Sequence, residues 1–199
     1  MTGWPRAVAL VPVNAEGVAM PERKRILLVS GSTRAGSTNT AALRTIQEVA
    51  PDSVTADLYG GLADLPAFNP DDDGADLPAP VAGLRRDIAA AAAVVFCTPE
   101  YAGTLPGSFK NLLDWTVGGA ELSGKPTAWI NVANEGRGDG AQATLLTVLG
   151  YVGAQIVEQA CRRLPVSREW VGPGGTITDP AFRAELTAAV VALARAEQA

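Results

Sequence analysis

The stretch from Arg25 to Leu43 constrains the fold more than any other part of the chain, because it places an apolar run, a polar turn and a helical pattern in that order. The run at 26–29 has the branched apolar residues of a strand buried in a parallel sheet, and Ala41 opens a series of good helix formers. Between them, Gly31 and Gly36 allow a tight turn. This order predicts a strand–loop–helix unit that can place a ligand at the start of the helix.

Hydroxyl, amide and guanidinium groups crowd this loop, which makes it a candidate phosphate site. A helix N-terminus adds partial positive charge to the N–H groups and hydroxyls there, and an arginine adds a full charge. A phosphate dianion matches that set of donors. A plainer interpretation, in which a serine-rich turn only caps the helix, stays open on the loop alone. The candidate phosphate ligands are Ser32, Arg34, Ser37, Thr38 and Asn39.

The glycine spacing of the loop separates it from two better-known phosphate-binding motifs. It does not follow G-x-G-x-x-G, and the sequence lacks the lysine of G-x-x-x-x-G-K-[ST]. The loop therefore favours a mononucleotide over the ligands of a dinucleotide-type Rossmann turn or a P-loop.

Composition narrows the chemistry further. The 199 residues suit one domain, and 47% of them are hydrophobic, which is enough for a core on both faces of a sheet. A net charge of -5 and a pI near 4.8 argue against a general nucleic-acid or membrane surface. The chain contains no histidine, so a Ser-His-Asp or Cys-His mechanism is excluded. These facts favour redox chemistry carried by a cofactor, which the protein binds and orients.

The remaining compositional features predict the chain's organisation and surroundings. Residues 1–23 are broken by prolines and predict a flexible N-terminal extension, followed by one domain over 24–199. Cys97 and Cys161 lie far apart, which favours free thiols in a reducing, cytoplasmic compartment. The acidic run at 71–73 is expected to be a solvated surface, and no metal site is predicted.

Apolar runs and helical patterns alternate along the rest of the chain. This alternation predicts an α/β fold: a doubly wound, five-stranded parallel sheet with strand order 2-1-3-4-5, in three α/β/α layers. A loop-like segment is predicted over 158–175. The strands are expected at 26–29, 54–58, 93–97 and 126–132, and residues 154–157 lead into a fifth strand. The helices are expected at 41–50, 81–92, 106–115, 141–151 and 180–196.

A second informative loop follows the third predicted strand. Loops after the first and third strands of such a sheet share one crevice. Pro99 stiffens the exit from the strand and Gly103 frees the backbone, so residues 100–103 present backbone groups that suit the edge of a flat heteroaromatic ring. Tyr101 either borders that ring or packs locally, as most loop aromatics do. A third glycine-rich loop, at 134–142, follows the fourth strand.

Together these segments resemble the NADPH-dependent FMN reductases of the flavodoxin-like fold, a family that includes quinone, azo-dye and chromate reductases. The motifs that carry the resemblance are GSTRAGSTN, LPAFNPDD, PEYAGTLPGSFKNLLDW and the glycine loop followed by AQATLLTVLGYVGA. The resemblance implies that the first loop holds the FMN phosphate through the five residues named above. It implies that the isoalloxazine ring lies against Pro99, Glu100, Tyr101, Ala102 and Gly103.

The resemblance also implies an activity. The chain would transfer a hydride from NAD(P)H to flavin N5 and on to a quinone, a free flavin or another small acceptor, with no catalytic side chain. It would form a homodimer or homotetramer, with LPAFNPDD and residues 110–115 near a neighbouring subunit. In the third loop Glu135 and Asp139 flank Arg137, so both NADPH and NADH stay open as donors. The alternatives are a flavodoxin-like FMN-binding electron carrier and a relative that binds no flavin.

Overall fold

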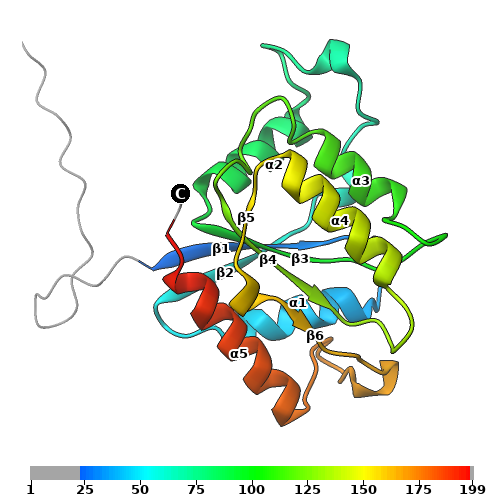
Figure 1. Cartoon of the computed structure of the whole chain (residues 1–199), viewed down its shortest axis with the longest axis vertical. Coiled ribbons are helices and arrows are strands. Elements are labelled where there is room, and N and C mark those ends of the chain that lie inside the picture. Colours follow the sequence, from blue (N-terminus) through cyan, green and yellow to red (C-terminus); the bar gives the residue numbers. More distant parts are fainter. Residues whose placement is uncertain (1–22, 198–199) are drawn as a thin grey trace, which may run out of the picture.

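The computed structural model describes residues 23–197, which form a parallel sheet between two layers of helices (Figure 1). The predicted extension at 1–23 lies outside the described residues, except for Arg23. The main path of the sheet has the order β2-β1-β3-β4-β5 with parallel pairing throughout, which confirms the predicted topology. The strands are β1 (Lys24–Ser30), β2 (Val54–Tyr59), β3 (Ala93–Cys97), β4 (Pro126–Asn131) and β5 (Gln155–Ile156).

Helices cover both faces of the sheet, which explains why the central strands are continuous apolar runs. In β1, Ile26 and Leu28 pack into the core on one face, and Leu27 and Val29 pack into the core on the other. The first core is covered by α1 (Thr38–Val49) and α5 (Pro180–Arg195) (Figure 1). The second is covered by α2 (Ala79–Ala90), α3 (Gly107–Asp114) and α4 (Asp139–Tyr151).

The segment predicted as a loop over 158–175 contains a short additional strand. In β6 (Arg162–Arg163) the two arginines pair in parallel with Ile130 and Asn131 of β4. Sequence reasoning missed β6 because two adjacent polar residues carry no apolar alternation. The 3₁₀ turns η3 (Glu158–Ala160) and η4 (Arg168–Trp170) flank it. As a result, the chain after β6 emerges at the carboxyl end of β4.

The long excursion at 60–78 contains the 3₁₀ turns η1 (Leu62–Asp64) and η2 (Pro70–Asp72), and α3 holds it in place. Asn111 accepts a hydrogen bond from the Phe68 N–H at 2.7 Å and donates to the Pro66 carbonyl at 2.8 Å. The Trp115 indole also donates to Pro66, at 2.9 Å, and its ring meets Phe68 edge to face at 5.0 Å. Within this chain, LPAFNPDD therefore contacts the KNLLDW segment, which consists of the last residues of α3 and its C-cap Trp115.

A partly buried ion pair fixes the same excursion to α2. Arg85 donates to Asp73 at 2.7 Å and to the Trp115 carbonyl at 2.8 Å. The arginine thus ties the excursion to the end of α3. Among the described residues, no helix is long and apolar enough to cross a membrane.

Candidate functional site

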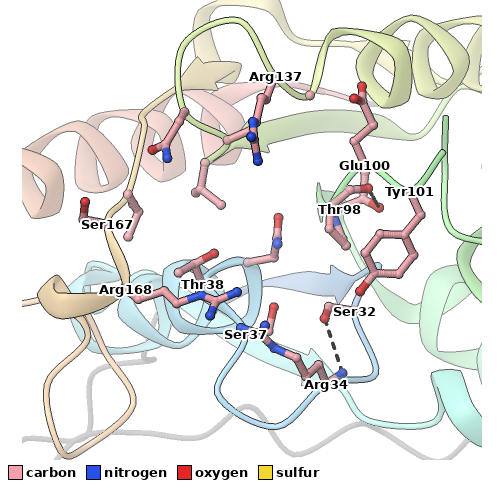
Figure 2. A pocket seen from close by; sticks show the side chains of 17 residues that line it. Ser32, Arg34, Ser37, Thr38, Thr98, Glu100, Tyr101, Arg137, Ser167 and Arg168 are labelled. Carbon is pink, nitrogen blue, oxygen red and sulfur yellow. Dashed lines mark hydrogen bonds between the residues drawn. The ribbon is translucent and has the colours of Figure 1, made fainter. Parts of the chain in front are cut away.

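A cavity of about 630 Å³ lies beyond the carboxyl ends of β1, β3 and β4 (Figure 2). The loops that follow β1 and β3 share it, as the topology predicts, and the loop after β4 joins them. Of the predicted ligand residues, Ala102 and Gly103 are not part of its lining. Those that line it are Ser32, Arg34, Ser37, Thr38, Asn39, Pro99, Glu100 and Tyr101.

The first loop places hydrogen-bond donors at the start of α1. Ser37 is the N-cap, and its hydroxyl accepts from the Thr40 N–H at 3.5 Å. The first backbone bond of the helix runs from Ala41 to the Ser37 carbonyl, so the N–H groups of Thr38 and Asn39 have no acceptor within the helix. Arg34 donates to the Gly36 carbonyl at 3.1 Å, which holds its guanidinium beside this turn.

A buried thiol orients one side chain of the lining. Cys97, the last residue of β3, donates to the Asn39 side-chain carbonyl at 3.3 Å. Burial raises the pKa of Cys97 far above its usual range, so the thiol keeps the proton that it donates. The carbonyl of Asn39 is therefore engaged, and its amide N–H₂ is the part that can meet a ligand.

The second loop ends in a tight turn. Tyr101 and Thr104 exchange backbone hydrogen bonds of 2.9 and 3.1 Å. Ala102 and Gly103 between them both have positive φ, at 50° and 76°. The turn is thus of the type that suits glycine or asparagine, and neither Ala102 nor Gly103 lines the cavity.

Glu100 has a contact that sequence reasoning did not predict. Its carboxylate accepts from the Ala141 N–H, in the first turn of α4, at 3.1 Å. In Figure 2 this side chain is directed toward the loop of Arg137 and away from Ser32. Gly140 lets the two segments meet, because a Cβ there would lie 2.0 Å from the Gly103 carbonyl oxygen. The second loop is therefore fixed against the N-terminus of α4.

The third loop has a different charge balance from the one that its sequence indicates. Asp139 forms an ion pair with Arg163 of β6, and Arg163 also donates to the Arg137 carbonyl at 3.2 Å. The Arg137 side chain lines the cavity. One of the two acids beside Arg137 is therefore already compensated.

A further wall of the cavity comes from Val166, Ser167 and Arg168, none of which was predicted as a site residue. Leu164 and Val166 donate backbone hydrogen bonds to the carbonyls of Asn131 (2.8 Å) and Val132 (3.1 Å), at the carboxyl end of β4 and one residue beyond it. These contacts continue the pairing of β6 with β4. The wall follows from long-range pairing, for which the local sequence carries no signal.

A family model for NADPH-dependent FMN reductases matches residues 24–164. The quinone reductase of Escherichia coli (strain K12) is 33% identical over 147 residues, which cover 70% of this chain and 77% of the relative. The NAD(P)H-dependent FMN reductase PA1204 of Pseudomonas aeruginosa is 36% identical over 126 residues, covering 62% and 67%. The structure of FerB, a flavoenzyme NAD(P)H:(acceptor) oxidoreductase from Paracoccus denitrificans, superimposes with a TM-score of 0.70 at 30% identity, covering 86% of this chain and 95% of FerB.

Proposed function

The chain belongs to the NADPH-dependent FMN reductase family, and from that premise we propose that it reduces quinones at the cavity beyond β1, β3 and β4. Membership makes it an NAD(P)H-dependent oxidoreductase with FMN as its cofactor. The acceptor and the residues that hold the cofactor are the parts that we propose.

The donors of the cavity fit FMN. The first loop offers the N–H groups of Thr38 and Asn39, the Ser32 hydroxyl and the Arg34 guanidinium, a set that suits a phosphate dianion. The cavity volume of about 630 Å³ lies within the range of about 300–1,000 Å³ common for small-molecule sites. Pro99, Tyr101 and Val132 add flat or apolar surface on which a ring can rest.

When bound, FMN supplies the redox chemistry, because it accepts a hydride from the nicotinamide and delivers electrons to the acceptor. The protein's part is binding and orientation. The first loop anchors the phosphate, and the second loop presents backbone groups to the ring edge. The contact of Glu100 with Ala141 holds that second loop at a fixed distance from α4.

The observation that carries the choice of acceptor is the 33% identity to a quinone reductase over 77% of that relative. A quinone is flat and needs only a stacking surface beside the cofactor and a route from solvent. Tyr101 lines the cavity and is 53% exposed. It therefore places an aromatic ring at the border where the cavity opens to solvent.

We infer that NADPH is the better donor, because the cavity carries more positive charge than the third loop alone indicates. Arg137 of the third loop lines it, apart from Arg34 and Arg168 beside the start of α1, whereas the carboxylate of Glu100 is directed at α4 and Asp139 is paired with Arg163. A 2′-phosphate favours such surroundings. We expect kcat/KM to be higher for NADPH than for NADH, and Arg137→Ala to narrow the difference. An equal preference in wild type would contradict this inference.

An anaerobic absorbance experiment tests the function as a whole. FMN-loaded protein is mixed with NADPH or NADH, and benzoquinone is then added. We expect rapid loss of the flavin absorbance and its return with quinone. Bound flavin that neither nicotinamide reduces would point to the electron carrier, and a protein that binds no flavin would overturn the assignment of all three loops.

The assembly and location of the enzyme are also proposals. We propose a homodimer or homotetramer, and the outer side of α4, where Tyr151 is 90% exposed and Leu146 is 39% exposed, supplies apolar surface for it. Light scattering of the purified protein tests this. The unpaired thiols of Cys97 and Cys161 support a cytoplasmic location, where NAD(P)H is available.

A further inference from the structure

The segment at 164–177, here called the strap, contributes residues 166–168 to the cavity wall and is fixed at both ends. Its first residues are hydrogen-bonded to the end of β4 through Leu164 and Val166. At its other end the Ile177 N–H donates to the Thr45 hydroxyl of α1 at 2.8 Å, and both residues are fully buried. The strap therefore connects the end of β4 to α1.

Arg168 is the strap residue that brings charge to the cavity. It begins η4 and lines the same cavity as Ser37 and Thr38. In Figure 2 its guanidinium extends from the strap toward Thr38, while Arg34 approaches Ser37 from the opposite side. Two guanidinium groups from distant parts of the sequence thus approach the same helix start.

The Arg168 side chain has no internal partner that accounts for its position. Within residues 23–197 it forms neither an ion pair nor a side-chain hydrogen bond. Its neighbours in sequence differ in this respect, since Arg162 pairs with Glu185 and Arg163 with Asp139. Structural ion pairing therefore explains the positions of the other two arginines but not that of Arg168, which is exposed and lines the cavity.

We propose that Arg168 binds the FMN phosphate opposite Arg34, as a second guanidinium supplied by the strap. The proposal rests on the assignment of this cavity to FMN. A phosphate dianion carries about two charges and three acceptor oxygens, which exceeds what one guanidinium and a helix N-terminus compensate. Arg168 supplies the further charge from the side of the phosphate that the first loop leaves open.

The test compares two flavins that differ only in the phosphate. Apoprotein is titrated with FMN and with riboflavin, and binding is followed by quenching of flavin fluorescence. The variants are Arg168→Ala, Arg168→Lys and, as a matched loss of charge outside the cavity, Arg86→Ala on the exposed side of α2. Circular dichroism establishes that each variant is folded.

We expect Arg168→Ala to weaken FMN binding about tenfold or more and to leave riboflavin binding within about twofold of wild type. The FMN affinity of Arg168→Lys should lie between those of Arg168→Ala and wild type, because lysine keeps the charge but lacks the planar guanidinium fork. Raising the salt concentration from about 0.05 M to about 0.5 M should weaken FMN binding less in Arg168→Ala than in wild type. Arg86→Ala should match wild type for both flavins.

Three other results would overturn the proposal. Equal losses for FMN and riboflavin would mean that Arg168 only shapes the strap. Unchanged FMN affinity with a raised KM for NADPH would assign the guanidinium to the nicotinamide dinucleotide. Unchanged behaviour toward both ligands would leave Arg168 without a role in the site. A wild-type protein that binds neither flavin would be a different failure, because it would overturn the proposed function itself.

Discussion

Ala102 has a backbone conformation that its side chain disfavours, since its φ of 50° lies in the left-handed region. An L-residue with a Cβ loses about 1–2 kcal/mol there, and asparagine tolerates the region better than alanine does. We expect Ala102→Asn to raise the free energy of unfolding in urea by about 0.5–1 kcal/mol.

Two other alanines provide controls for this prediction. Ala120 has a φ of 55° and lies outside the cavity. Ala120→Asn should raise the free energy of unfolding by a similar amount. Ala89 is exposed within α2. Ala89→Asn should instead lower the free energy of unfolding by about 0.5 kcal/mol, because asparagine is a poorer helix former than alanine. A loss of stability in both Ala102→Asn and Ala120→Asn would contradict the strain argument.

Arg34 is the residue of the first loop whose removal should weaken FMN binding most. It supplies a full charge beside the start of α1, where its guanidinium is held by the Gly36 carbonyl. We expect Arg34→Ala to weaken FMN binding by about 2 kcal/mol, the size of a charge-assisted contact. Isothermal titration of the apoprotein measures this directly, and unchanged affinity would remove Arg34 from the phosphate site.

Among the secondary-structure elements, the joint between the second loop and α4 depends on Glu100. Its carboxylate accepts the Ala141 N–H at 3.1 Å and lies at the positive end of the helix dipole. We expect Glu100→Ala to lower the free energy of unfolding by about 1–2 kcal/mol, and Glu100→Gln by less, because glutamine keeps an acceptor. Glu135→Ala, on an exposed residue of the third loop, is the matched control and should change little. A Glu100→Ala variant as stable as this control would show that the contact is incidental.

The elements that the sequence predicts well are those with a local cause. β3 has the predicted bounds, and α1 ends at Val49, two residues before Pro51, because the residue before proline disfavours the helical conformation. The three loops were found because each follows an apolar strand. β6 and Arg168 were missed because their places depend on pairing with β4, a partner some thirty residues earlier in the chain. The Glu100 contact was missed for the same reason, since Ala141 belongs to another element.

At the scale of the whole molecule, the alkaline limit of stability should depend on one tyrosine. Burial, together with Asp87 and Asp64, raises the pKa of Tyr59 from 10.0 to about 12. The folded state therefore holds this proton more tightly than the unfolded state does. The contribution of this proton to the free energy of unfolding is fully present below pH 10 and is lost as the pH rises from 10 to about 12.

Comparison of wild type with Tyr59→Phe isolates this contribution from other groups that titrate in the same range. We expect the free energy of unfolding of wild type to fall between pH 10 and 12 by about 1 kcal/mol more than that of the variant, after allowance for solvent near a half-buried group. Parallel curves for the two proteins would mean that Tyr59 has the same pKa in both states.

The strap begins where the family match ends, at residue 164. One wall of the cavity is therefore built from a part of the chain that the shared family core does not include. Within the strap, residues 166–168 line the cavity, whereas Ile177 is buried and bonded to Thr45 of α1. A change at positions 167 and 168 would thus alter the surface that faces the bound molecule, including the proposed contact of Arg168 with the FMN phosphate, while the buried anchor at Ile177 keeps the strap attached to α1.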